Sequence, residues 1–106
     1  MAWRSSSTTH EGLVNNLVSG GIIQSDAVAK AMKTVDRRYY VKPGQDPYQD
    51  SPQVIGYGAT ISAPHMHAWC LELLSDRLRP GSQALDVGSG SGYFTVLMAA
   101  MMAAGV

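Results

Sequence analysis

The chain has 106 residues, which is enough for one domain but leaves no room for two. Eight basic residues balance eight acidic ones, so the charge gives no reason to expect a nucleic acid or an anionic membrane as partner. The only cysteine, Cys70, excludes an intrachain disulfide and is typical of a reducing cytoplasm. The sequence shows no secretory signal, and its longest apolar helix candidate, residues 93–106, is shorter than the ~20 residues of a membrane span.

The first half of the chain predicts two helices and an exposed loop. Thr8 and Glu11 have the spacing of a capping box for a first helix, which ends at Gly20-Gly21. Ser25-Asp26 predicts the start of a second helix, expected to finish near Asp36-Arg37-Arg38. Residues 42–52 are dense in turn formers and predict a loop. Within it, Asp50-Ser51-Pro52 is interpreted mainly as a turn, although Ser51 could also help to bind a ligand.

The middle of the chain predicts a short β segment and a third helix. Residues 54–61 are rich in β-formers but broken by two glycines, which indicates a bent strand or a short hairpin whose backbone lies close to another group, with a ligand as one candidate. The helix runs from about Pro64 to Leu78. Its expected buried side consists of Met66, Trp69, Cys70, Leu73, Leu74 and Leu78, with Glu72, Asp76 and Arg77 mostly outward. Trp69 and Tyr93 are expected in the core rather than as stacking platforms.

A strand, a glycine-rich loop and a helix follow in the order of a nucleotide-binding half-site. Residues 82–87 predict the strand, residues 88–92 the loop and residues 93–104 the helix. Gly88 and Gly90 start a dinucleotide-binding pattern, but Tyr93 occupies the position of its last glycine. The carboxylate of Asp86 would repel a pyrophosphate and attract a cation, which favours S-adenosylmethionine and leaves a nicotinamide oxidoreductase least favoured. The alternative is a glycine turn that serves packing alone.

Ser62 and two histidines flank the predicted start of the third helix. The free amides and positive dipole end of a helix favour a carboxylate, so a bound acid could lie beside Ser62. The alternative is that Ser62 is simply the N-cap of this helix. His65 and His67 are two positions apart and point to different sides of a helix, so no metal site is predicted.

Together, four stretches resemble the protein-L-isoaspartate O-methyltransferase family. They are Asp50-Ser51-Pro52-Gln53, Ile55-Gly56-Tyr57, residues 60–68 (TISAPHMHA) and residues 85–92 (LDVGSGSG). Residues 60–68 are far more specific than the glycine loop, which a methyltransferase for a small acid would share. The resemblance implies an α/β, Rossmann-like fold of the S-adenosylmethionine-dependent methyltransferases. It also implies methyl transfer to the α-carboxyl of isoaspartyl residues in damaged proteins, which leads to their repair.

The resemblance also implies roles for individual residues. The positions that match the family's cofactor contacts are Ile55, Gly56, Tyr57, Gly58, Ser62, Asp86, Val87, Gly88, Ser89 and Gly90. Ser62 matches the serine regarded as the family's active-site residue. Many relatives carry a polar amide where this chain has Gly58, so only backbone contacts are expected there. The expected partners are isoaspartyl-containing proteins and peptides. The chain itself is expected to be a monomer in the cytoplasm.

Members of this family are about twice as long as this chain. The sequence therefore predicts a single incomplete domain, truncated after the first strand, loop and helix. Residues 1–53 would form its N-terminal helices and loop, and residues 54–106 the start of the cofactor-binding core. The alternative to an active enzyme is an inactive truncated fragment or splice product that acts, if at all, through binding a partner.

Overall fold

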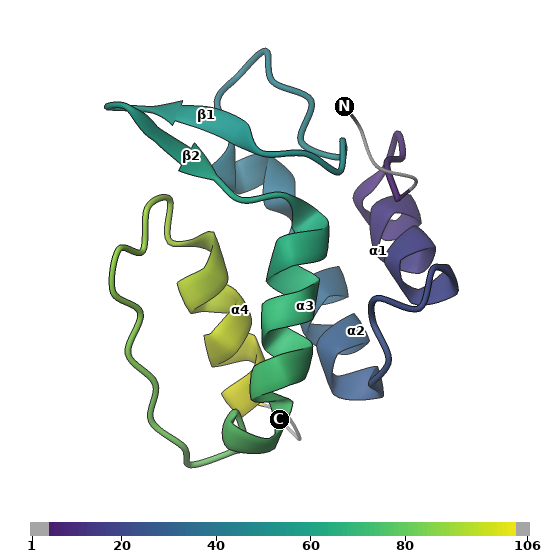
Figure 1. Ribbon diagram of the computed structural model, residues 1–106, viewed down its shortest axis with the longest axis vertical. Coiled ribbons are helices and arrows are strands. Elements are labelled where there is room, and N and C mark those ends of the chain that lie inside the picture. Colours follow the sequence, from purple (N-terminus) through teal and green to yellow (C-terminus); the bar gives the residue numbers. More distant parts are fainter. Residues whose placement is uncertain (1–4, 104–106) are drawn as a thin grey trace.

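The computed structural model describes residues 5–103, which form a helical body with one β-hairpin at its end (Figure 1). In chain order the elements are α1 (His10–Ser19), α2 (Asp26–Thr34), the 3-10 turn η1 (Arg37–Tyr40), β1 (Gln53–Gly56), β2 (Ala59–Ile61), α3 (Pro64–Leu74), the 3-10 turn η2 (Ser75–Arg77) and α4 (Tyr93–Met102). Within this described range, no helix combines the length and the apolar character that crossing a membrane requires.

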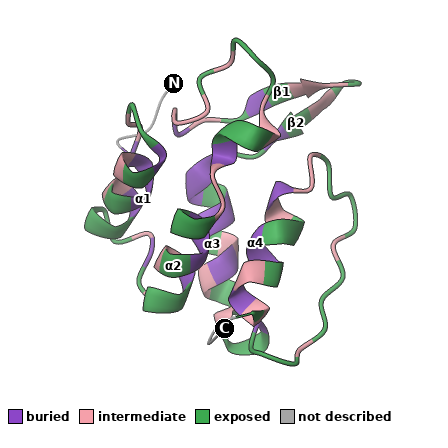
Figure 2. Cartoon of the chain, turned by 180° about the vertical axis from the view of Figure 1, so that it is seen from behind, coloured by how far each residue is buried: buried purple, intermediate pink, exposed green. Residues whose placement is uncertain are grey.

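Helix α2 is the centre of the packing, because it contacts α1, α3 and α4. Each helix turns an apolar side inward, as the buried stripes in Figure 2 show. The fully buried members of this core include Leu13, Leu17, Val28, Met32, Leu71 and Leu97. Burying one such side chain contributes about 1.5–3 kcal/mol, so these contacts hold the helices together and position the hairpin and loops beside them.

Both N-terminal helices begin with a capping side chain. The hydroxyl of Thr9 accepts a hydrogen bond from the backbone N–H of Gly12 at 3.0 Å, so the predicted cap at Thr8 is wrong by one residue. The predicted cap at Ser25 is confirmed, since its hydroxyl accepts from the N–H of Val28. Helix α2 ends earlier than predicted because Val35 has extended backbone angles. Arg37 and Arg38 consequently lie in the separate turn η1.

The β segment is a hairpin, one of the two forms that the sequence predicted. Strands β1 and β2 pair antiparallel, with Gln53 opposite Ile61 and an irregularity after Val54. Tyr57 and Gly58 at its tip both have positive φ, of 55° and 70°. Two-residue hairpin turns need this backbone because it matches the twist of the strands. Gly58 adopts it without strain, whereas Tyr57 is the one non-glycine residue in the described range with positive φ.

The predicted buried side of α3 is largely wrong. Helix α3 instead buries His65, His67, Ala68 and Leu71. Of the predicted set, Met66, Trp69, Leu73 and Leu74 are exposed, Cys70 is half-buried, and only Leu78 beyond the helix is buried. Because the helix is apolar on most of its circumference, periodicity fits more than one face, and packing against distant elements such as α2 decides which face is buried. Tyr93 is buried as predicted, but Trp69 is 58% exposed.

The predicted strand at residues 82–87 is not formed. This segment is irregular, and Leu85 and Val87 are 86% and 85% exposed. A strand needs a neighbouring backbone for its N–H and C=O groups, and the strands of the described range pair only with each other in the hairpin. The glycine loop and α4 nevertheless follow as predicted, and α4 packs against α2. Residue 104, the predicted end of this helix, lies outside the described residues.

Candidate active site

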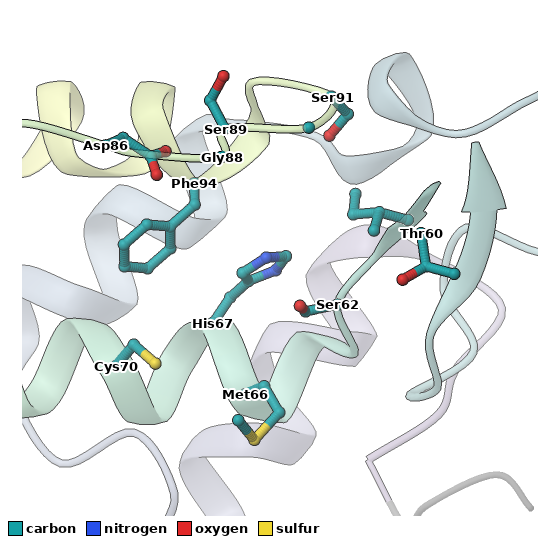
Figure 3. Close-up of a pocket in the computed structure, with 12 residues that line it drawn as sticks. Thr60, Ser62, Met66, His67, Cys70, Asp86, Gly88, Ser89, Ser91 and Phe94 are labelled. Atoms are coloured by element: carbon teal, nitrogen blue, oxygen red, sulfur yellow. The ribbon is translucent and has the colours of Figure 1, made fainter. Parts of the chain in front are cut away.

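A cavity of about 230 Å³ lies between the glycine loop with the start of α4 on one side and the end of β2 with α3 on the other (Figure 3). Its lining consists of Thr60, Ile61, Ser62, Met66, His67, Cys70, Asp86, Gly88, Ser89, Gly90, Ser91 and Phe94. Two stretches that are distant in the sequence, residues 60–70 and 86–94, therefore form its two walls. These are the stretches in which the sequence placed its candidate serine and its candidate loop.

The glycine loop presents bare backbone to the cavity. Gly88, Gly90 and Gly92 have φ values of 75°, 56° and 84°, which glycine adopts without steric cost. The loop is closed by a hydrogen bond from the N–H of Gly92 to the carbonyl of Ser89 at 2.9 Å. A Cβ atom at Gly88 would meet nothing within 4 Å, so a ligand can approach this backbone closely.

Asp86 supplies the negative charge of the loop. Its half-buried carboxylate lines the cavity and accepts a hydrogen bond from the hydroxyl of Thr95 on α4 at 2.6 Å. This bond fixes the carboxylate at one edge of the cavity and leaves its other oxygen for a ligand. A cation or a hydroxyl donor suits that oxygen, whereas a phosphate group does not.

Ser62 lies on the opposite wall, directly before α3. The N-cap of α3 is Ala63, which makes no side-chain cap bond, so the alternative that Ser62 caps this helix is wrong. The Ser62 side chain is exposed on the cavity wall, and within the described range no group hydrogen-bonds to its hydroxyl. Its backbone carbonyl, in contrast, accepts a hydrogen bond from the guanidinium of Arg37 at 2.9 Å. The hydroxyl is therefore available to a bound molecule while the backbone behind it is held.

His67 points into the cavity from α3 and is buried (Figure 3). Its ring stacks on Phe94, with centroids 5.6 Å apart, and meets the edge of Tyr93. Burial, helped by the positive charge of Arg37 and opposed by Asp86, lowers the pKa of His67 to about 4. The imidazole is therefore neutral near pH 7, and its Nδ1 has no hydrogen-bond partner in the described structure.

The hairpin residues that the sequence placed in the site divide into two groups. Ile55 adjoins the glycine loop, because a Cβ at Gly90 would lie 3.7 Å from its Cδ1. Gly56, Tyr57 and Gly58 form the hairpin tip and do not line the cavity, although Tyr57 and Ile55 border a neighbouring hollow together with Gly90. Val87 also does not line the cavity. The structure thus brings together Ser62, Asp86, Gly88, Ser89 and Gly90.

Sequence reasoning missed a buried charge cluster behind the cavity. The carboxylate of Asp50 is completely buried and accepts a hydrogen bond at 2.9 Å from the backbone N–H of His65, and it lies 2.9 Å from that residue's Nδ1. Asp50 is therefore more than the turn residue predicted for it. Arg37, interpreted as the end of a helix, is completely buried as well. Hydrophobic periodicity contains no signal for such residues, since polar residues are assigned to the surface by default.

Among residues 5–103, no three His, Cys, Asp or Glu side chains are grouped in a way that could hold an ion. His65 contacts Asp50, whereas His67 faces the cavity, so the two histidines point to different places as their spacing predicted.

Comparison with known proteins gives a consistent set of relatives. The family model described as protein-L-isoaspartate(D-aspartate) O-methyltransferase matches residues 8–106. Proteins named protein-L-isoaspartate O-methyltransferase are 57% identical in Triticum aestivum, over 88% of this chain, and 52% identical in Caenorhabditis elegans, over 96% of it. The chain spans only 40% and 44% of the length of these two relatives.

A solved structure extends the likeness to three dimensions. It is the protein-L-isoaspartate O-methyltransferase of Plasmodium falciparum, in complex with S-adenosyl-L-homocysteine. That protein is 52% identical to this chain, with a TM-score of 0.84, and the match covers 91% of this chain and 43% of the other. The described fold is thus similar to part of a larger methyltransferase fold.

Proposed function

Since this chain belongs to the protein-L-isoaspartate(D-aspartate) O-methyltransferase family, we propose that its cavity binds S-adenosylmethionine and serves methyl transfer to isoaspartyl residues of damaged proteins. The observation that carries the proposal is the position of Ser62 opposite the glycine loop, on the other wall of one cavity. The same likeness supports S-adenosylmethionine as the methyl donor, because the Plasmodium relative was solved with the demethylated cofactor.

The residues of the cavity fit this cofactor. Gly88 and Gly90, whose positive φ favours glycine, place no side chain in the path of a ligand, and the carboxylate of Asp86 suits the cofactor's ammonium or sulfonium charge. A cavity of about 230 Å³ is smaller than the roughly 300–1,000 Å³ of typical ligand pockets, so we interpret the described residues as one part of the binding surface. We propose that Asp86, Gly88, Ser89 and Gly90 hold the cofactor in the cavity, with Ser62 beside it on the opposite wall. The other positions that the resemblance assigns to the cofactor do not line the cavity and stay predictions: Ile55, Gly56, Tyr57, Gly58 and Val87.

When bound, S-adenosylmethionine supplies an electrophilic methyl group on a sulfonium. The chain's own residues then have mainly to orient the acceptor, because a carboxyl with a pKa of ~3.5 is already ionised at pH 7 and needs no general base. The free hydroxyl of Ser62 is proposed to donate a hydrogen bond to this carboxylate. Orientation alone contributes up to ~7–11 kcal/mol in ideal systems, which makes so small a set of catalytic residues sufficient.

The test is methyl transfer from labelled S-adenosylmethionine to an isoaspartyl peptide, compared with its aspartyl twin. We expect transfer to the isoaspartyl peptide alone. We expect Ser62→Ala to lower turnover by roughly 100–1,000-fold, the range for losing one positioned donor, while affinity for S-adenosylhomocysteine changes less than about twofold. Ser19→Ala, at an exposed position of α1, is the matched control. Unchanged turnover in Ser62→Ala would contradict the role of Ser62.

A second candidate function is supported by one observation. Trp69, Leu73, Leu85 and Val87 are large apolar side chains left exposed, a feature typical of surfaces that bind another protein. A chain that folds and associates with a partner but transfers no methyl group would support this alternative.

The single cysteine and the balanced charge support a cytoplasmic location without nucleic acid as partner, which cell fractionation would test.

A further inference from the structure

Arg37 is a fully charged side chain with no exposure to solvent. Burial lowers the pKa of its guanidinium to about 10, opposed by Tyr93 and Asp50, so it remains a cation at neutral pH. Taking such a charge out of water is expensive and is tolerated only where the surrounding groups compensate. Because of this cost, a completely buried arginine is expected to have a specific structural or functional role.

Arg37 donates hydrogen bonds to two backbone carbonyls, one of which belongs to the cavity-lining Ser62. Its Nη1 donates to the carbonyl of Ser62 at 2.9 Å, and its Nη2 donates to the carbonyl of Ser51 at 3.2 Å. The planar guanidinium presents these donors as a rigid fork, so one side chain sets the separation of the two carbonyls. Ser51 belongs to the loop before β1, and Ser62 lies between β2 and α3.

Other elements close around the same side chain. The Cζ of Arg37 lies 6.0 Å from the ring centroid of Tyr93, which begins α4 after the glycine loop. The negative charge of the buried Asp50 carboxylate raises the pKa of Arg37, and the same carboxylate accepts a hydrogen bond from the N–H of His65 on α3. Arg37 thus contacts the loop before β1, the segment between β2 and α3, and the start of α4.

We propose that Arg37 is a positioning residue for Ser62, which it acts on by clamping the carbonyls of Ser51 and Ser62 at a fixed separation. The inference rests on the proposed function, because it takes the Ser62 hydroxyl as the group that orients the acceptor. Ser62 has no cap bond of its own, so the clamp on its carbonyl holds it in place. A misplacement of about 1 Å in a positioned group can cost on the order of 100-fold in rate, which makes such a clamp consequential.

The variant that tests the clamp is Arg37→Lys. Lysine keeps the positive charge but offers a compact ammonium that cannot bridge two carbonyls as a planar fork. Arg38→Lys is the matched control in the same turn, because Arg38 is exposed and donates to the hydroxyl of Tyr39. Leu17→Ala controls for lost stability, since Leu17 is a buried residue of α1 that does not line the cavity.

Two readouts are made on each variant at a temperature where it is folded. The first is the set of backbone NMR chemical shifts, which in Arg37→Lys we expect to change most at Ser51, Ser62 and their neighbours. The second is methyl transfer, in which we expect kcat to fall at least roughly tenfold while KM for S-adenosylmethionine stays within about threefold. Both controls are expected to keep the wild-type chemical shifts of Ser51 and Ser62 and the wild-type kcat and KM. If Arg37→Lys behaves like Leu17→Ala in both readouts, its role is structural only and the proposal is overturned.

A measurement on the unaltered chain covers the case in which Arg37→Lys does not fold. In the clamp, rotation of the guanidinium is hindered, so 15N-labelled arginine should give separately resolved Nη–H signals for Arg37 and averaged signals for exposed Arg38. Averaged signals for both residues would overturn the clamp. If the unaltered chain transfers no methyl group, the proposed function fails for this chain, while the shifts of Ser51 and Ser62 still decide whether Arg37 positions Ser62.

Discussion

The neutral imidazole of His67 is an unusual group to keep inside a protein. A buried polar atom without a partner costs about 1–3 kcal/mol, and Nδ1 of His67 is such an atom. The ring contacts Phe94 and Tyr93 recover part of this cost. Protonation would add a charge next to Arg37 in a site that water barely reaches, so the folded state resists it.

This resistance predicts acid sensitivity. The pKa of His67 is about 4 when folded and 6.5 in its ordinary state, so between these values the unfolded chain binds the extra proton. Stability therefore falls as the pH drops, with a contribution from His67 of about 2–3 kcal/mol on going from pH 7 to pH 4.5. Denaturant unfolding at both pH values checks this. His67→Phe and His67→Gln, which cannot titrate, should lose less stability than the wild type, and equal losses would contradict the assignment.

At the scale of elements, one side chain couples α3 to the start of α2. The carboxylate of Glu72, half-buried rather than mostly outward as predicted, accepts hydrogen bonds from the N–H groups of Gln24 and Ser25 at 2.7 and 2.9 Å. It also accepts from the hydroxyl of Ser25, the N-cap of α2. A negative charge at this position is favourable because the N-terminus of a helix is its positive dipole end.

We expect Glu72→Ala to lower the free energy of unfolding by about 1–2 kcal/mol, because two backbone donors lose a charged acceptor. Glu72→Gln keeps an oxygen acceptor without the charge and should lose less. Asp76→Ala, at an exposed position in η2, is the control and should change stability by less than about 0.5 kcal/mol. Urea unfolding of the three variants makes the comparison, and equal stability of Glu72→Ala and Asp76→Ala would count against this coupling.

The elements show where sequence reasoning succeeds and where it ends. Local signals predicted the cap at Ser25, the hairpin, the turn-rich loop and the glycine loop, because each depends on neighbouring residues alone. The buried side of α3 and the strand at residues 82–87 depend on distant parts of the chain, and there the predictions failed. The candidate site divides in the same way. Ser62 and Asp86 follow from motifs, whereas the burial of Arg37 and Asp50 is visible only once the segments are assembled.

At the scale of the whole molecule, the packing leaves a sizeable apolar surface uncovered. Three large apolar side chains are each at least 80% exposed: Leu73 on α3, and Leu85 and Val87 before the glycine loop. Single exposed apolar residues are common, but several large ones on a chain of this size favour association. We therefore predict that the 106-residue chain on its own tends to self-associate, which would be tested against the expected monomer.

A variant with Leu73→Gln, Leu85→Ser and Val87→Ser should remain monomeric at concentrations where the unaltered chain forms larger species. Its free energy of unfolding should change by less than about 1 kcal/mol, since none of these side chains belongs to the core. Sedimentation velocity and light scattering across a concentration series measure the difference. Val54→Thr, at an exposed position of the hairpin, is the control. If the triple variant associates as strongly as the unaltered chain, the association involves a different surface and the prediction is wrong.

The two walls of the cavity lie on separate stretches of chain that meet only in the folded state. One of these stretches is joined to the end of α2 by a hydrogen bond: the hydroxyl of Tyr93 donates to the carbonyl of Val35 at 3.2 Å. A small molecule that fills the cavity can therefore bind the folded chain alone, and by mass action it stabilises that state by about 2.7 kcal/mol at 100 times its dissociation constant. The fraction of folded chain would then rise with the concentration of a ligand for this cavity, so the residues proposed to recognise the cofactor would also stabilise the fold.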